Sequence, residues 1–417
     1  PEAIRAETNY GITPHEVMIV NGRDRSQEEF FLAAAVTSGL KKVVIPFFDK
    51  GIPVEYELVR SITTVSKSKT YKVGIVDTGI PFVHPNSDHR REWPLLTELR
   101  KQYDIDDRPV DPSQPIKDSY DVLIAIQPSM LGPQELDHLV DAIRNGTPTA
   151  ILEDTHPHFF PQTVAATSEP RQQPGMMGGM FGGGQNIPKG DIEQLWRTLG
   201  VTMQPMEVVW QDYDPEQTVR GFTDDQWVFI DSGNGAKYPL SPDSPITSGM
   251  NQILLPYPGS VAKVEESTLG FLPLVVTGSS NSGTLNTPGL RRGQGNMRSF
   301  DNRTTNSYIL AAHIQGTITD DDLLLSTEED LTVDTEGEES EGEDTEEIVE
   351  EKTESHDINV VVVTDIDWII PDFFMIRQSG GEDVLPATQN VTFILNIIDA
   401  LVGDDRFIEI RKRTRTH

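Results

Sequence analysis

The chain has 417 residues, of which 36% are hydrophobic and 24% charged, and its formal net charge is −32. This length predicts two or three domains, and the charge excludes a nucleic-acid partner, because such faces need clustered Lys and Arg to neutralise phosphates. The absence of cysteine excludes disulfides, cysteine nucleophiles and thiolate metal sites.

No membrane-spanning segment or signal peptide is visible, because no run approaches about 18 apolar residues. The chain begins and ends abruptly, at "PEAIRAETNY" and "RKRTRTH". We therefore expect it to be part of a longer protein, which leaves open the presence of membrane anchors outside this sequence.

Residues 1–69 are predicted to form an N-terminal region of β-hairpin and helix. Two apolar runs surround Ser38 and Gly39, a pair that favours a tight turn. Pro53 suits the first turn of a helix. The apolar face expected of this helix consists of Tyr56, Leu58, Val59 and Ile62.

From residue 70 the pattern changes to alternating strands and helices. The segment "WPLLTELRKQYDI" suits a helix followed by the start of a strand. The segment 121–154 suits strand, helix and strand, with Pro133 near the start of the helix and Gly146 after its end. Such units favour parallel strands and right-handed crossovers. The prediction is a Rossmann-like α/β fold with a mainly parallel sheet and helices on both faces.

The α/β pattern resumes near the C-terminus. The segment "INVVVVTDIDWIIPDFF" has the strongest buried-strand pattern in the chain, and "NVTFILNIIDALVG" predicts a helix closed by Gly403. The predicted α/β domain therefore comprises residues 70–319 and 358–417.

Three segments are predicted to be loop insertions in this domain. Residues 172–186 are rich in Gly and Met, and residues 278–306 are polar and rich in Gly, Asn, Ser and Thr. In residues 320–357, 19 of 38 residues are acidic, and their mutual repulsion predicts disorder. An alternative for this acidic segment is that it binds calcium or attracts a basic partner.

Polar residues follow the predicted strands, where ligands bind in doubly wound sheets. These residues are Asp77, Gln127, Ser129, Glu153, Asp154, Asp365 and Asp367. The carboxylates could hold Mg²⁺ or Ca²⁺ if they converge. We favour the alternative that they cap turns and helices, a role that suits Asp.

Other chemistry has weaker support. A zinc site would draw on Asp154 and on histidines in two loops, but prolines break any helical spacing between them. These histidines are His84, His89, His156 and His158. A G-x-S-x-G elbow and a Walker A loop are both absent. We therefore predict no catalytic residues, metal or cofactor.

Taken in order, six segments resemble the ABC-type uncharacterized transport system family, whose named member is the gliding-motility auxiliary protein GldG. The segments are "VVIPFFDKGIPVEYELVRSITTVSK", "YKVGIVDTG", "YDVLIAIQPSMLGPQELDHLVDAIRNGTPTAILEDTHPH", "SYILAAHIQG", "VVVVTDIDWIIPDFF" and "NVTFILNIIDALVG". The resemblance covers nearly the whole chain apart from the Gly/Met-rich and acidic segments. The family's "DP" corresponds here to "DTHP" at 154–157, a departure from its pattern.

The resemblance implies a flavodoxin-like ectodomain on the periplasmic side of the cytoplasmic membrane, held by flanking transmembrane helices. Its partners would be ABC permease and ATPase subunits. It implies no catalytic residues, so the expected function is non-enzymatic: the domain binds a partner or ligand and couples this binding to a permease. The candidate ligand-binding residues are Asp77, Gln127, Ser129, Asp154, His156 and Asp365.

Two alternatives remain open at this point. A carbohydrate or small-ligand module would need a deep pocket at Asp77, Gln127 and Asp154, with Trp93 or Phe82 nearby. A metal-dependent hydrolase would need three strand-end groups within roughly 2–2.6 Å of one ion. The groups that could serve are Asp77, Asp154, His156, Asp365 and Asp367.

Overall fold

A computed structural model describes most of the chain. The described residues are 2–12, 14–21, 24–39, 41–45, 54–66, 70–80, 93–117, 119–160, 171–172, 186–215, 225–287, 304–319, 355–374, 388–404 and 406–408. The acidic residues 320–354 and the Gly/Met-rich residues 173–185 lie outside this part, so the predictions made for them are not tested.

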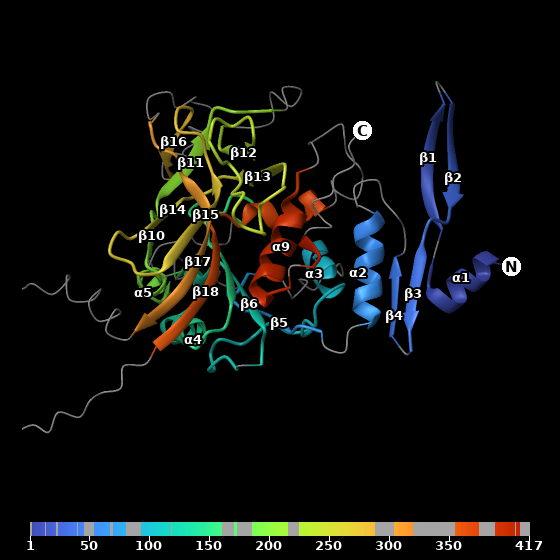
Figure 1. The fold of residues 1–417 in the computed structure, drawn as a ribbon, viewed down its shortest axis with the longest axis horizontal. Coiled ribbons are helices and arrows are strands. Elements are labelled where there is room, and N and C mark those ends of the chain that lie inside the picture. The colour runs from blue at the N-terminus through green and yellow to red at the C-terminus, as the bar shows by residue number, and fades with distance from the viewer. Residues whose placement is uncertain are drawn as a thin grey trace, which may run out of the picture.

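A six-stranded sheet in the order β15-β17-β18-β7-β6-β5 forms the centre of the molecule (Figure 1). Its strands are β5 (Val73–Ile75), β6 (Val122–Ile126), β7 (Thr149–Leu152), β15 (Gly270–Val276), β17 (Ile309–Thr319) and β18 (Ser355–Val363). The four strands from β5 to β18 are mutually parallel, whereas β17 runs antiparallel to both of its neighbours. The predicted α/β class and mostly parallel sheet are therefore confirmed.

Residues 104–110 extend this sheet beyond β5. Parallel bridges join Lys72 to Asp104 and Val76 to Val110, and the Val110 amide donates a 2.7 Å hydrogen bond to the Ile75 carbonyl. This segment follows the α3 helix, as the sequence predicted. Numbered along the chain, the five parallel segments therefore lie in the spatial order 2-1-3-4-5.

Helices cover both faces of the sheet, as expected (Figure 1). One face packs against α3 (Pro94–Arg100) and α9 (Asn390–Val402), and the other packs against α4 (Pro133–Arg144) and α5 (Ile192–Thr198). Alternate side chains of β6 pack into the hydrophobic clusters on the two faces of the sheet, with Ile124 on the α9 side and Leu123 on the α4 side. Gly403 ends α9 with φ 72°, the left-handed conformation that glycine adopts freely. None of the described helices is both long and apolar enough to cross a membrane.

Small antiparallel pairs of strands accompany the central sheet. They are β8 (Arg171–Gln172) with β9 (Asn186–Ile187), β10 (Val201–Met203) with β14 (Val261–Lys263), β11 (Glu207–Gln211) with β16 (Ser282–Asn286), and β12 (Trp227–Asp231) with β13 (Gln252–Pro256). The prediction that residues 278–306 form one long loop is wrong in part. Residues 282–286 pair with β11, whose buried hydrophobic side chains stabilise the polar strand.

The N-terminal region forms two hairpins and two helices beside the α/β core (Figure 1). Its elements are α1 (Glu2–Tyr10), β1 (His15–Asn21), β2 (Asp24–Phe30), β3 (Ala34–Ser38), β4 (Lys41–Ile45) and α2 (Val54–Ser66). The predicted hairpin is confirmed, because β3 and β4 pair across Gly39, which has φ 59°. The predicted α2 helix is confirmed as well.

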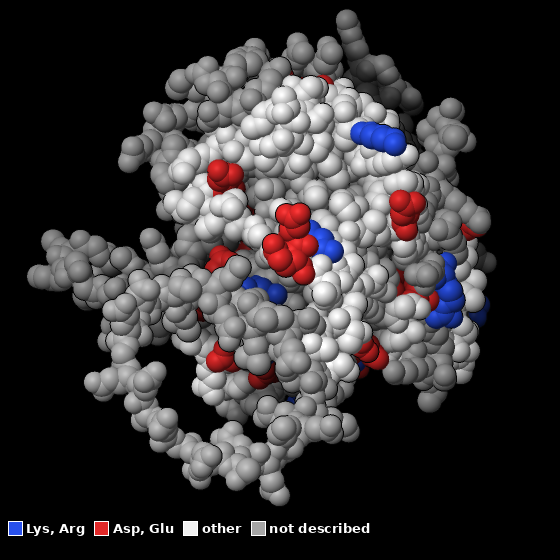
Figure 2. Space-filling view, turned by 60° about the vertical axis from the view of Figure 1, so that its left-hand side comes forward, with Lys and Arg blue, Asp and Glu red and all other residues white. Residues whose placement is uncertain are grey.

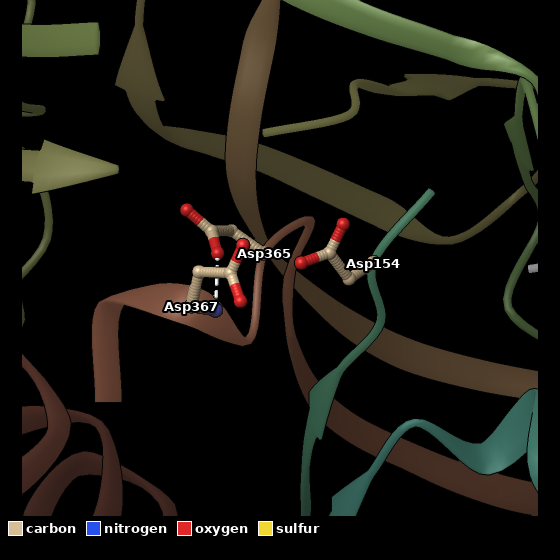
Figure 3. Close-up of side chains that lie close together, drawn as sticks. All are labelled: Asp154, Asp365 and Asp367. Carbon is tan, nitrogen blue, oxygen red and sulfur yellow. Dashed lines mark hydrogen bonds between the residues drawn. The ribbon is translucent and has the colours of Figure 1, made fainter. Parts of the chain in front are cut away.

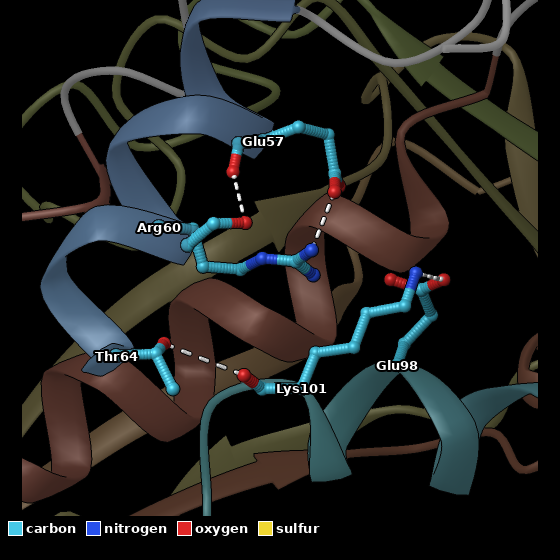
Figure 4. A network of polar contacts seen from close by, with 6 residues as sticks. Glu57, Arg60, Thr64, Glu98 and Lys101 are labelled. Atoms are coloured by element: carbon cyan, nitrogen blue, oxygen red, sulfur yellow. Dashed lines mark hydrogen bonds and ion pairs between the residues drawn. The ribbon is translucent and has the colours of Figure 1, made fainter. Parts of the chain in front are cut away.

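The buried face of α2 differs from the predicted one. Ile62 is 54% exposed, whereas the ion-paired side chains of Glu57 and Arg60 are buried. Figure 4 shows these charged groups on the side of α2 that faces α3 and α9. Thr64 adds a 3.5 Å hydrogen bond from its hydroxyl to the carbonyl of Lys101, just after α3. A polar contact therefore helps to hold the N-terminal region against the α/β core.

Figure 2 shows how charged side chains are distributed on one face of the molecule. On the face drawn in Figure 2, Lys and Arg lie singly or in small groups beside acidic groups, and a broad area carries neither sign. The described side chains on this face form no broad basic patch of the kind that binds phosphates.

Arg60→Ala is expected to lower the free energy of unfolding by about 3 kcal/mol or more, because it leaves the Glu57 carboxylate buried without its partner. Urea unfolding followed by circular dichroism measures this change. The matched control is Arg197→Ala, which removes a partly exposed 3.1 Å ion pair with Asp191 and should cost less than about 1 kcal/mol. Equal effects of the two substitutions would contradict the role given to the buried pair.

Candidate functional site

The parallel strands β6, β7 and β18 are consecutive neighbours, so the residues that follow them meet at one edge of the sheet. The short helix η1 (Pro128–Met130) follows β6, and η4 (Asp367–Ile369) follows β18. The side chains that meet here are polar, and each is at most 1% exposed: Gln127, Ser129, Glu153, Asp154, Asp365 and Asp367. The site is therefore a buried polar layer and not an open cleft.

The amide of Gln127 joins the ends of β6 and β7. Its Oε1 accepts a 2.9 Å hydrogen bond from the backbone N–H of Asp154, and its Nε2 donates a 2.8 Å hydrogen bond to the Asp154 carbonyl. Gln127 has φ 55°, in the left-handed region, which is uncommon for a residue other than glycine. The side chain thus continues the hydrogen bonding between the two strand ends beyond the backbone bond from Gln127 to Leu152.

Glu153 fixes the turn after β6. Its two carboxylate oxygens accept hydrogen bonds from the backbone N–H of Ser129 at 3.0 Å and from the Ser129 hydroxyl at 2.5 Å. Burial raises the pKa of Glu153 to about 7, while the hydrogen bonds from Ser129 and the charge of Lys189 oppose this rise.

Asp154, Asp365 and Asp367 form a carboxylate triad. Each offers one oxygen, and these oxygens lie within 4.8 Å of one another. Figure 3 shows Asp154 approaching from the end of β7 and the other two from the segment after β18. Among the described residues, this is the only cluster of acidic or imidazole groups with such spacing.

Backbone N–H groups occupy most of the triad's oxygens. Asp154 accepts from His156 at 2.6 Å and from Ile366 at 3.2 Å. Asp367 accepts from His158 at 2.8 Å and from Phe159 at 3.0 Å. The triad therefore organises the loop 155–160 and the turn after β18, which is the capping role favoured from sequence.

Asp365 differs from its two neighbours. Its Oδ1 accepts a 2.5 Å hydrogen bond from the Asp367 N–H, while its buried Oδ2 has no hydrogen-bond partner within the described structure. Burial, followed by repulsion from Asp154 and Asp367, raises the pKa of Asp365 well above its usual range. Burial raises the pKa of Asp154 too, with repulsion from Asp367, and it raises the pKa of Asp367 to about 7.

The structure brings four of the six predicted ligand-binding residues into the buried layer: Gln127, Ser129, Asp154 and Asp365. The exposed Asp77 lies apart from the triad, and its Oδ1 accepts a 3.0 Å hydrogen bond from Gly79 in a local turn. His156 is half-buried, and its ring lies 5.5 Å from that of Tyr257. Tyr257, which also stacks on His158 at 4.3 Å, had no sequence signal of its own.

Of the two aromatic groups named for a carbohydrate pocket, one lies in the described structure. Trp93 stacks on Phe160 at 5.8 Å, and Phe82 lies outside the described residues. A surface pocket of about 590 Å³ lies along residues 106–120 instead, and its lining includes none of the strand-end groups.

The raised pKa values of Glu153 and Asp367 predict that the protein loses stability as pH rises. Both pKa values are about 7 in the folded protein, above those of exposed carboxyls, so the folded state binds more protons than the unfolded state between about pH 4 and 7. The free energy of unfolding should fall across that window, by on the order of 3 kcal/mol per group, and level off above it. Urea unfolding at several pH values measures this slope.

Glu153→Gln provides the comparison for this prediction. The amide can accept from the Ser129 N–H and donate to the Ser129 hydroxyl, so the turn is retained without a titrating group. The variant should have a shallower pH slope than the wild type. Identical slopes would show that Glu153 does not titrate in this range.

Comparison with known protein families identifies the family to which this chain belongs. Residues 70–397 match the model of the family described as ABC-type uncharacterized transport system. No curated protein matches the chain. No solved structure matches it either. The family match covers more than half of the 417 residues and the whole central sheet, so the chain belongs to the ABC-type uncharacterized transport system family.

Proposed function

We propose that this chain is the non-enzymatic extracytoplasmic domain of an ABC-transporter auxiliary subunit of the GldG-like type. Membership of the transport family, over a range that includes all six strands of the central sheet, carries this proposal. The domain binds a partner or ligand on the periplasmic side and transmits this binding to permease and ATPase subunits. Its connection to the cytoplasmic membrane is supplied by transmembrane segments outside this chain.

We further assign the α/β domain a flavodoxin-like fold. The support is the order 2-1-3-4-5 of the five parallel segments, together with helices on both faces of the sheet. In that topology the order reverses between β5 and β6, next to the turn that contains Asp77. A ligand at this reversal would lie beside the exposed carboxylate of Asp77 and apart from the buried triad.

The burial and the hydrogen bonding of the strand-end groups support a non-enzymatic role. A hydrolase needs carboxylates that reach the substrate, whereas those of Asp154, Asp365 and Asp367 are completely buried. A small-ligand module needs polar groups free to bind, whereas Gln127 and Ser129 bond to their own strand ends. Of the predicted ligand-binding residues, Asp77 and His156 keep accessible side chains, so we place direct ligand contact at these two positions.

Transmission of a binding event requires the domain to move as a unit. The contact of α2 with the α3 region supports this requirement, because the part-buried hydroxyl of Thr64 donates a 3.5 Å hydrogen bond to the carbonyl of Lys101 in the α/β core (Figure 4). A partner that binds and moves the N-terminal region would therefore move the α/β core as well.

The test is co-purification of the full-length protein, tagged and cross-linked in its native membrane before extraction in mild detergent. We expect mass spectrometry to recover an ABC permease and an ATPase subunit. A membrane protein of similar abundance that carries the same tag is the control for adventitious recovery. Isolation of a free monomer that hydrolyses substrate, without any transporter subunit, would contradict the proposal.

A further inference from the structure

The surface pocket along residues 106–120 has the size of a small-molecule site. Its volume of about 590 Å³ lies within the range of about 300–1,000 Å³ that is typical of ligand pockets. Neither Asp77 nor His156 lines it, so it is separate from the contact positions proposed above. A large share of its lining is apolar or aromatic, which suits the body of an organic molecule. These side chains are Pro109, Val110, Pro115, Ile116 and Tyr120.

The inner wall of the pocket is held in place by β5 and α4. A Cβ atom at Gly74 in β5 would lie 2.8 Å from both Cδ1 of Tyr120 and Cγ2 of Val110, which is too close for any side chain. Tyr120 and Val110 therefore pack directly on the backbone of Gly74, a close approach that glycine permits. The ring Nδ1 of His138 in α4 lies 2.8 Å from the carbonyl oxygen of Pro112 and anchors the loop that follows. The pocket is thus largely formed before a ligand binds.

Ion pairs neutralise two of the three carboxylates in the lining. Asp106 lies 3.0 Å from Nζ of Lys72, and it also accepts a 3.0 Å hydrogen bond from the Tyr120 hydroxyl. Asp107 lies 3.2 Å from the guanidinium of Arg100. The partners of both carboxylates belong to the protein itself, so these groups do not give the pocket a net negative charge.

The two cations of the lining, in contrast, have no ion partner. Arg108 and Lys117 are exposed, and neither forms an ion pair or a side-chain hydrogen bond within the described part of the chain. Asp111 is the remaining carboxylate, and its Oδ1 accepts a 2.9 Å hydrogen bond from the backbone N–H of Ser113. Two unpaired positive charges therefore outnumber one unpaired negative charge, and an anionic group would supply the partner that they lack.

We propose that this pocket binds a small organic anion. Arg108 and Lys117 hold its carboxylate or phosphate group at the rim, and the apolar body packs beside Ile116 and Tyr120. Arginine forms paired hydrogen bonds with either anionic group. The net charge of −32 on the whole chain opposes such binding only weakly, because exposed charges farther away than about 8 Å are largely screened at physiological ionic strength.

Methyl NMR on the full chain, with isoleucine δ1 methyl groups labelled, provides the direct test. The probes are benzoate and phenyl phosphate, and benzyl alcohol is the neutral probe of similar size. We expect at least one anion to shift the Ile116 methyl signal saturably, benzyl alcohol to have a much smaller effect, and the buried Ile246 on the other face of the sheet to be unaffected. The stronger of the two anions identifies the group as carboxylate or phosphate. Absence of a saturable shift with both anions, or an equal effect of benzyl alcohol, would overturn the proposal.

Substitutions that change charge test the sign of the ligand. Arg108→Gln and Lys117→Gln should each weaken binding of the better anion about threefold or more, and the double variant about tenfold. The hydrogen bonds from Ser113 hold the pKa of Asp111 below its usual range, so this carboxylate is ionised at neutral pH. Asp111→Asn retains an acceptor for the Ser113 N–H and should bind the anion as tightly as the wild type or more tightly. A loss of affinity in Asp111→Asn would indicate a cationic ligand and would contradict the proposal.

Lys237→Gln is the matched control. Lys237 is an exposed lysine whose Nζ lies 5.0 Å from the ring centre of Tyr238, and it does not line the pocket. This variant should bind the anion as the wild type does, whereas an unchanged affinity in the Arg108→Gln/Lys117→Gln double variant would sink the proposal. Recovery of transporter subunits tests the proposed function separately, so either idea can fail without the other.

Discussion

The fold depends on satisfying polar backbone groups where its buried strands end. Parallel strands covered on both faces cannot leave N–H and C=O groups without partners. Here side chains provide the partners: Gln127 holds the backbone of Asp154, and Asp154 holds the N–H groups of His156 and Ile366. Asp367 then holds the loop after β7. These contacts join the ends of three neighbouring strands in series, so the most polar part of the interior also fixes its geometry.

The same layer explains why acidic residues at strand ends are ambiguous in a sequence. Asp after a strand suits a turn, a ligand site and a metal site equally well, and only position in space separates them. Asp77 and Asp154 both follow a short apolar run, yet Asp77 is exposed beside its own turn and Asp154 is completely buried. Their difference arises from neighbours that are distant in sequence, because β18 lies beside β7 and not beside β5.

Local patterns predicted the elements whose signal is contained within a few residues. The helices at 133–144 and 390–402, with closing glycines at 146 and 403, were predicted because spacing and capping agreed. The strand at 282–286 was missed, since its polar residues are ordered by pairing with β11. The buried side of α2 was also mistaken: the ion pair of Glu57 and Arg60 is buried, whereas Ile62 is 54% exposed. The first error reflects pairing with a strand that is distant in sequence, whereas the second involves a charged pair within α2 itself.

The junction of β17 and β18 has a consequence for how this fold can vary. Thr319 and Ser355 are direct partners in the antiparallel ladder, and the pairing continues from there to Ala311 and Val363. The acidic stretch therefore leaves and re-enters the sheet at adjacent points, and the ladder sets its own register independently of that stretch. Such a junction tolerates insertions. Residues 320–354 could be lengthened, shortened or replaced by a foreign module while the strands on either side kept their alignment.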